Sequence, residues 1–139
     1  VILKTMSNTM EHEWTYPARC IEVVDGDTVD LELDLGFRVK KHVRVRLKGV
    51  DTAEVYGVEK GSDEYIQGKE QSRLTESYLA QASKSDIDNT YPLLFLSDGE
   101  KGKFGRWIGD ITLNFDQDIT ELSLAETLEK EYPSVTSDN

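Results

Sequence analysis

The chain has 139 residues, of which 37% are hydrophobic and 31% are charged, a composition typical of one globular domain with its own core. Acidic residues outnumber basic ones by 27 to 16, and the net charge of −11 argues against a protein whose main work is to grip polyanions. No apolar run approaches the length of a membrane span, and the single Cys20 excludes an intrachain disulfide. We therefore expect a soluble, monomeric protein that does not act at a membrane.

One domain is expected over residues 17–132. Residues 1–16 lack a clear periodicity and are expected to form a loosely ordered arm, and residues 133–139 a disordered tail. Because the chain begins with Val1 rather than Met, its localisation stays open, and secretion after removal of a leader is one option.

The first predicted strand, over residues 19–24, leads into an acidic corner, Asp25-Gly26-Asp27. Asp27 shares the odd numbering of the apolar residues that follow it, and this parity would place its carboxylate on the buried side. A buried carboxylate is costly unless a positive group compensates it. The sequence offers arginines or a bound cation for that role.

A β-hairpin is predicted next, because apolar and polar residues alternate over residues 28–35 and again over residues 39–48. The odd-numbered apolar residues, from Val29 to Leu35 and from Val39 to Leu47, are expected on the buried face, and the even-numbered polar residues, Glu32 among them, on the solvent face. A turn centred on Gly36 would pair acidic with basic or weakly polar residues across the two strands. The expected pairs are Asp34 with Arg38, Glu32 with Lys40, and Asp30 with His42.

In this register Arg44, Arg46 and Lys48 have no acidic partner on the opposite strand, and Arg46 lies beside Gly26. Strict parity puts Arg46 and Asp27 on opposite faces, so their contact would need a bulge or bend at Gly26 or Gly49. Arg46 could equally be a structural ion-pair partner of one of the corner carboxylates.

The remaining elements follow from periodicity and from turn residues. They are a loop over residues 50–61, a helix from Ser62 or Asp63 to about Ser83, a strand over 91–97, a mobile loop over 98–102, a strand over 104–112 and a short helix after Thr120.

Three separated motifs carry the functional signal. They are Asp25-Gly26-Asp27-Thr28-Val29, then Arg46 followed by Asp51-Thr52-Ala53-Glu54, and late in the chain Lys103-Phe104-Gly105-Arg106. This ordered set resembles the staphylococcal (thermonuclease-like) nuclease family over roughly residues 21–128. The resemblance implies an α+β fold, a small five-stranded OB-type β-barrel with two or three packed helices. It also implies a calcium-dependent endonuclease that hydrolyses phosphodiester bonds of DNA and RNA and leaves 3′-phosphates.

The resemblance also assigns roles to residues of this chain. Asp27, Asp51 and the backbone carbonyl of Thr52 would bind Ca²⁺, Glu54 would activate the water, Arg46 and Arg106 would bind the phosphate, and Lys103 and Phe104 would contact the substrate.

The chemistry of these residue types agrees with that assignment. Calcium prefers hard oxygen ligands, and the sequence has no Cys/His set for zinc. A glutamate near the attacking water can orient it or accept its proton. Guanidinium groups form forked hydrogen bonds to phosphate oxygens, which a lysine cannot reproduce.

Some residues depart from the family pattern. Ala53 replaces a proline, which frees the backbone before Glu54, and Phe104 replaces a tyrosine whose hydroxyl could touch a phosphate. The tyrosines that flank the base in the family have no match here, so base stacking would be weaker or would come from Trp107 or Tyr56.

A second hypothesis is a non-catalytic, nuclease-like OB-fold module that binds nucleic acid or protein. Retention of all five acidic and arginine side chains favours the enzyme, whereas the acidity of the chain favours the binding module. A third hypothesis is an enzyme restricted to a special substrate or a secreted setting. The preference between DNA and RNA stays open.

Overall fold

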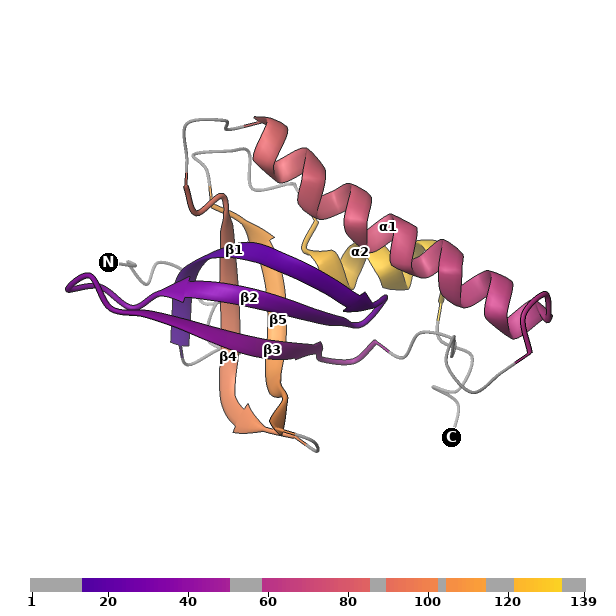
Figure 1. Ribbon diagram of the computed structural model, residues 1–139, viewed down its shortest axis with the longest axis horizontal. Coiled ribbons are helices and arrows are strands. Elements are labelled where there is room, and N and C mark those ends of the chain that lie inside the picture. The colour runs from indigo at the N-terminus through magenta and orange to yellow at the C-terminus, as the bar shows by residue number, and fades with distance from the viewer. Residues whose placement is uncertain (1–13, 51–58, 86–89, 103–104, 115–121, 134–139) are drawn as a thin grey trace.

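The computed structural model of the protein describes residues 14–50, 59–85, 90–102, 105–114 and 122–133. Within these ranges the chain forms five strands and two helices (Figure 1). In chain order they are β1 (Trp14–Asp25), β2 (Thr28–Asp34), β3 (Lys40–Leu47), α1 (Asp63–Ser85), β4 (Leu93–Lys101), β5 (Trp107–Leu113) and α2 (Leu124–Glu131).

The strands close into a barrel in the order β1-β2-β3-β5-β4. The β3–β5 pair is parallel, and the other neighbouring pairs are antiparallel. The first half of β1 pairs with β4 and its second half with β2, and two register shifts in the second half help the strand bend around the barrel. This architecture confirms the predicted fold class, a small α+β protein with an OB-type barrel.

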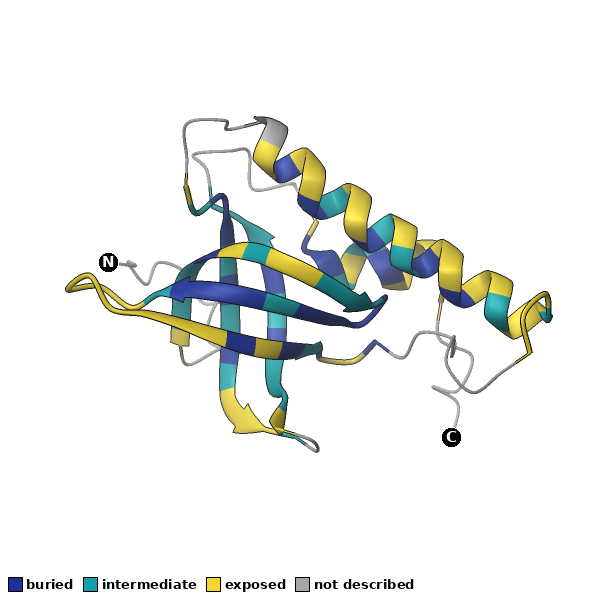
Figure 2. Ribbon diagram, viewed as in Figure 1, coloured by how far each residue is buried: buried dark blue, intermediate teal, exposed yellow. Residues whose placement is uncertain are grey.

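The barrel interior is filled by the apolar positions of the predicted hairpin together with those of β4 and β5 (Figure 2). The helices add Leu79, Ala82, Leu124 and Leu128 to this core. The predicted burial is wrong at Leu35 and Val39, which are 37% and 50% exposed, because the end of the hairpin extends beyond the barrel wall. The buried hairpin residues are Val29, Leu31, Leu33, Val43, Val45 and Leu47.

The predicted register of the hairpin is also wrong, by two residues. Glu32 lies opposite His42 rather than Lys40, because the turn is centred on Phe37 and not on Gly36. Leu35 N–H donates to Val39 O at 2.9 Å, and Phe37 and Arg38 have φ angles of 55° and 65°. Left-handed conformations at a phenylalanine and an arginine are uncommon, so the sequence carries little signal for this turn. The other register partners are Thr28 with Arg46, Asp30 with Arg44, and Asp34 with Lys40.

Two further boundaries differ from expectation. Strand β1 begins at Trp14, which pairs with Ser97 of β4, so residues 14–16 belong to the barrel and not to the expected arm. Strand β4 continues through Lys101, across the stretch expected to be a mobile loop. Trp14 is ordered by pairing with a distant part of the chain, and Lys101 by pairing with Trp107 at the start of β5, and local periodicity reveals neither pairing.

Both helices lie at the end of the barrel where β1 meets β2 (Figure 1). Helix α1 contacts β1 and α2, and α2 contacts β5. The Tyr78 hydroxyl on α1 donates to Leu122 O at 2.9 Å, which ties α1 to the segment entering α2. Neither described helix combines the length and the apolar character that crossing a bilayer requires.

Candidate functional site

The turn between β1 and β2 buries Asp27. Only 7% of this residue is exposed, and its Oδ1 accepts a hydrogen bond of 2.9 Å from the Thr28 hydroxyl. The backbone is fixed as well, because Leu47 N–H donates to Asp27 O at 2.9 Å and joins the turn to the end of β3. The Asp27 carboxylate is thus buried and hydrogen-bonded, unlike that of a solvent-exposed turn residue.

Arg46 lies next to this carboxylate. Its Nη2 is 3.5 Å from Asp27 Oδ2, and its Nη1 donates to Leu47 O at 2.7 Å and also to Val50 O. The parity conflict is resolved because Gly26 and Asp27 form the turn before β2 begins at Thr28, so strand alternation does not apply to Asp27. The contact between Asp27 and Arg46, which the sequence left open, is therefore present, and Arg46 pairs with Thr28 rather than lying beside Gly26.

Arg46 also holds the point at which the second acidic motif begins. Val50, whose carbonyl it binds, is buried and directly precedes Asp51 in the chain. The chain is therefore in contact with the Asp27–Arg46 pair at the residue directly before the second acidic motif. The expected site residues Asp51, Thr52, Glu54, Lys103 and Phe104 all lie outside the described residues.

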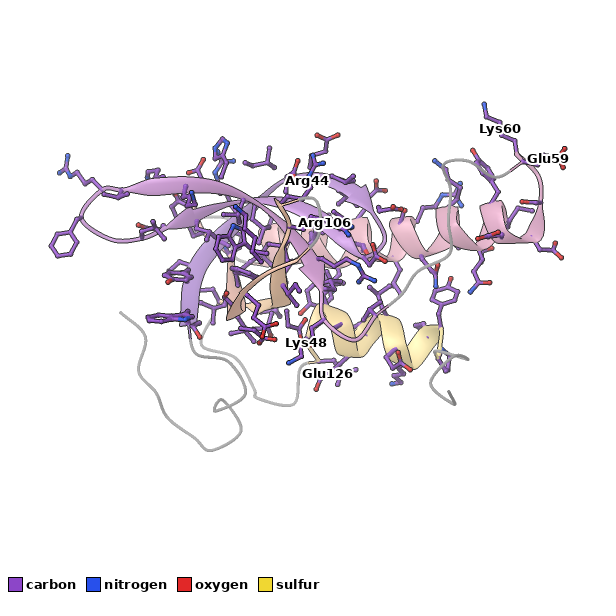
Figure 3. All side chains as sticks on the ribbon, turned by 90° about the horizontal axis from the view of Figure 1, so that it is seen from below. Arg44, Lys48, Glu59, Lys60, Arg106 and Glu126 are labelled. Carbon is purple, nitrogen blue, oxygen red and sulfur yellow. The ribbon has the colours of Figure 1, made fainter. Side chains whose placement is uncertain are left out.

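Arg106 lies beside β3, just before the neighbouring strand begins. It directly precedes β5, which runs parallel to β3 with Ile108 as the register partner of Arg46. Arg106 is therefore two residues before the partner of Arg46, and it is partly exposed. Figure 3 shows Arg106 and Arg44 over the barrel, with Glu59 and Lys60 at the far end of α1.

Helix α1 supports the acidic corner through Thr75, a residue that the sequence reasoning missed. Thr75 is fully buried, and its hydroxyl donates to Gly26 O at 2.7 Å. The available signal was its position four residues before Leu79, on the apolar stripe of the predicted helix. A polar side chain in such a stripe needs a partner, and here the partner is the turn that carries Asp27.

Two of the basic residues that were expected to lack an acidic partner do have one. Arg44 forms a two-pronged pair with Asp30, at 2.7 and 2.9 Å, and this contact raises the pKa of Arg44. Lys48 Nζ is 2.8 Å from Asp98 Oδ2. The expectation that Arg44, Arg46 and Lys48 lack acidic partners is wrong, and neighbouring carboxylates neutralise part of the positive charge along β3.

Glu32 forms a second polar cluster on β2. It accepts hydrogen bonds from the Tyr91 hydroxyl at 2.6 Å and from Arg19 at 2.8 Å, and His42 Nε2 is 3.4 Å away. The hydrogen bond from Tyr91 and that from Arg19 lower the pKa of Glu32 to about 2. None of the expected site residues within the described ranges belongs to this cluster, and its interactions join β1, β2, β3 and the segment before β4.

Asp27 is the described residue that is expected to bind a metal ion. Among the described residues no three His, Cys, Asp or Glu side chains gather as a metal-binding group. The Asp27 side chain is 10% exposed and presents carboxylate oxygens at a fixed corner. Carboxylate oxygens of this kind are ligands that a hard cation such as Ca²⁺ prefers, and Asp51, the second expected carboxylate, lies outside the described residues.

No model of a known protein family matches the chain, and no curated protein matches it either.

Proposed function

We propose that the protein is a calcium-dependent endonuclease that hydrolyses phosphodiester bonds of DNA and RNA, works as a monomer and leaves 3′-phosphates. The observation that supports this most is the pairing of buried Asp27 with Arg46 at the point where the chain enters Asp51. A carboxylate that could bind a cation and a guanidinium that could bind a phosphate are thus adjacent at one corner of an OB-type barrel. Resemblance to the staphylococcal nuclease family in three ordered motifs supports the same proposal.

The arginines bind and orient the phosphate in this proposal. Arg46 is held by the carbonyls of Leu47 and Val50, so its guanidinium is positioned before substrate arrives. Arg106 approaches from the parallel strand beside β3 and supplies a second forked donor. Donors fixed in advance stabilise the charge that grows on the phosphate oxygens without having to reorganise during the reaction.

Asp27, Asp51 and the carbonyl of Thr52 would hold the calcium ion. When bound, the ion neutralises phosphate charge and makes a nearby water more acidic. Glu54 orients the attacking water and accepts its proton, and Lys103 and Phe104 contact the substrate near Arg106.

Plasmid nicking tests the proposal. The protein should nick a plasmid in calcium and lose that activity in chelator, with magnesium as the comparison metal. Glu54→Gln should lower the rate by about 10²–10⁴-fold, the usual contribution of a general base. Glu59→Gln is the matched control, because Glu59 is an exposed residue just before α1 and should leave the rate unchanged. Equal rates in calcium and chelator, or a full rate in Glu54→Gln, would contradict the proposal.

A non-catalytic module that binds nucleic acid or protein is the second candidate. The observation that favours it is the engagement of Arg46, whose contacts with Asp27 and two carbonyls would also serve a purely structural role. Under this reading the protein binds single-stranded nucleic acid but leaves it intact in calcium.

A further inference from the structure

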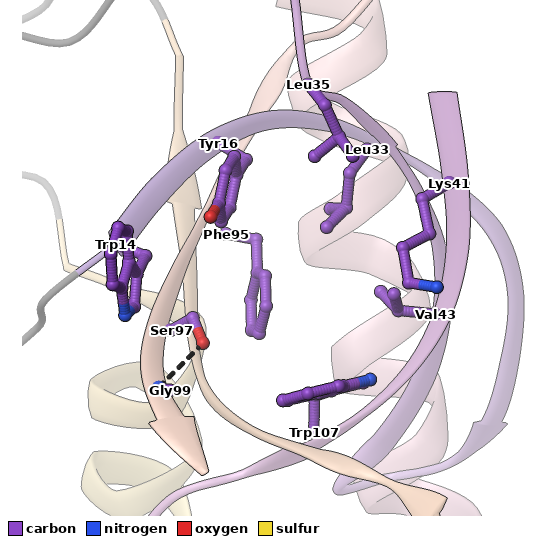
Figure 4. Close-up of a pocket in the computed structure, with 10 residues that line it drawn as sticks. All are labelled: Trp14, Tyr16, Leu33, Leu35, Lys41, Val43, Phe95, Ser97, Gly99 and Trp107. Carbon is purple, nitrogen blue, oxygen red and sulfur yellow. Dashed lines mark hydrogen bonds between the residues drawn. The ribbon is translucent and has the colours of Figure 1, made fainter. Parts of the chain in front are cut away.

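A cavity of about 310 Å³ opens at the barrel end away from the two helices (Figure 4). Four aromatic rings line it, those of Trp14, Tyr16, Phe95 and Trp107. Its volume lies at the small end of the range for ligand pockets, and mouths of β-barrels are common places for them. Of the described residues expected to bind the ion or the phosphate, none lines this cavity, whereas Trp107, which the sequence offered as a stacking residue, does.

The walls of the cavity suit a flat, apolar ring. Phe95 is 2% exposed, whereas Trp14 is 51% exposed and stands at the opening. Ser97 contributes a hydroxyl, which accepts a hydrogen bond of 2.9 Å from Gly99 N–H (Figure 4). Stacking surfaces with one polar group nearby are the usual means of holding a nucleobase without reading its identity.

The rim carries positive charge in a protein whose net charge is −11. Lys41 lines the cavity, and Lys101 Nζ lies 5.3 Å from the centre of the Trp107 ring. An uncharged apolar ligand would gain nothing from one ammonium group in the lining and a second beside the Trp107 ring. A nucleobase attached to a phosphodiester backbone would contact both the aromatic side chains and the lysine ammonium groups.

The position of Trp107 links the cavity to the proposed phosphate site. Trp107 directly follows Arg106, and its register partner Val45 directly precedes Arg46. The cavity and the proposed phosphate site are thus neighbours along the paired strands β3 and β5, although strand alternation turns Val45 and Arg46 to opposite faces of the sheet. Continuity with the phosphate-binding arginines favours a nucleic-acid strand over a peptide as the occupant.

We propose that this barrel mouth is a stacking subsite for an unpaired base of single-stranded nucleic acid. The path of the strand rests on the proposed function, because Arg106 is its other contact. A base within a duplex cannot enter the cavity without leaving its stack, so the subsite favours single strands and unpaired ends. Trp14, Tyr16 and Trp107 supply the stacking surfaces, and Lys41 and Lys101 contact the backbone.

Intrinsic fluorescence reports on this cavity directly, because the chain has two tryptophans and both line it. The full chain in chelator is titrated with a short oligothymidylate and with an abasic strand of equal length and charge. The proposal predicts saturable quenching by oligothymidylate and binding of the abasic strand about tenfold weaker, since stacking of one base contributes a factor of this order.

Variants of Trp14 separate stacking from charge. Trp14→Ala should lower the affinity for oligothymidylate about tenfold, and Trp14→Phe should keep it within about twofold, because phenylalanine also stacks. Phe37→Ala is the aromatic control, since Phe37 is fully exposed at the hairpin tip and does not line the cavity. Thermal melting checks that each variant is folded.

Several results would overturn the subsite. They are equal affinity of the two strands, wild-type affinity in folded Trp14→Ala, or an equal loss in Phe37→Ala. The nuclease proposal fails separately: a chain that never nicks in calcium but shows the Trp14 dependence would keep the subsite and lose the enzyme. A chain that nicks in calcium without any Trp14 dependence would keep the enzyme and lose the subsite.

Discussion

Glu32 shows how a single side chain ties the barrel together. Its carboxylate accepts hydrogen bonds from Tyr91 and Arg19 and lies near His42, so it links β2 to β1, to β3 and to the segment before β4. These interactions favour the ionised carboxylate and lower its pKa to about 2. The alternation in the sequence predicted a solvated position for Glu32, but the residue is 8% exposed.

The lowered pKa predicts how stability depends on pH. A carboxyl group with a lower pKa in the folded state stabilises the fold above its unfolded pKa, and this contribution disappears as pH falls towards the folded pKa. For Glu32 the contribution should be complete above about pH 5 and should be lost progressively towards about pH 2.

Urea unfolding of Glu32→Gln checks this prediction. The difference in the free energy of unfolding between wild type and variant should be largest near neutral pH and should shrink as pH falls below about 4. Glu59→Gln, at an exposed position, should show little difference at any pH. A difference for Glu32→Gln that stays constant from neutral to acidic pH would show that the pairing does not favour the ionised form.

Among the site residues, the sequence left open whether Asp27 and Arg46 meet. Period-2 parity places them on opposite faces, and the contact arises because Asp27 lies in the turn before β2. The pairing of Arg44 with Asp30 was missed, because it depends on a register that is set by the left-handed turn at Phe37 and Arg38. Local turn geometry therefore decides which cations have partners.

At the scale of elements, α1 holds the acidic corner against the barrel. The Thr75 hydroxyl bonds to Gly26 O, and this contact joins residues far apart in sequence. The helix itself was predicted from its apolar spacing, and it runs from Asp63 to Ser85. The contact with Gly26 could not be predicted, because it depends on the angle at which the helix crosses β1.

Thr75→Val tests this support. Valine keeps the shape of the side chain but leaves Gly26 O without its donor, which should cost about 1–3 kcal/mol of unfolding free energy. If the contact positions Asp27, turnover should also fall about tenfold, with little change in substrate affinity. Unfolding by urea and plasmid nicking in calcium measure the two effects.

Thr127→Val is the matched control, because the Thr127 hydroxyl on α2 donates to the carbonyl of Ser123, the residue that caps this helix. It should lower stability modestly and leave turnover unchanged. If both variants affect turnover equally, the Thr75 contact matters only for general stability.

At the scale of the whole molecule, the fold was predictable and the charge distribution was not. The alternating runs predicted the hairpin, and the resemblance carried by the ordered motifs implied the barrel, which the structure confirms. The closure of β1 onto β4 was missed at Trp14, because that pairing spans most of the chain. The cavity at the barrel mouth was missed for the same reason, since its rings come from strands that are distant in sequence.

The net charge of −11 sets the expected kinetics of a nuclease on this scaffold. Arg44 and Lys48 are paired with acids, so long-range attraction of a polyanion is weak. Encounter with substrate would be slow, and catalysis would depend on contacts made at short range by Arg46 and Arg106.

Single-turnover cleavage by Arg46 variants tests the central claim most directly. In calcium, Arg46→Ala should lower the rate of the chemical step by about 10²–10³-fold, and Arg46→Lys should recover little of it, because lysine cannot form the forked contact with the phosphate. Melting curves establish that both variants remain folded. Cleavage at the wild-type rate by either folded variant would contradict the account and would leave Arg46 as a structural partner of Asp27.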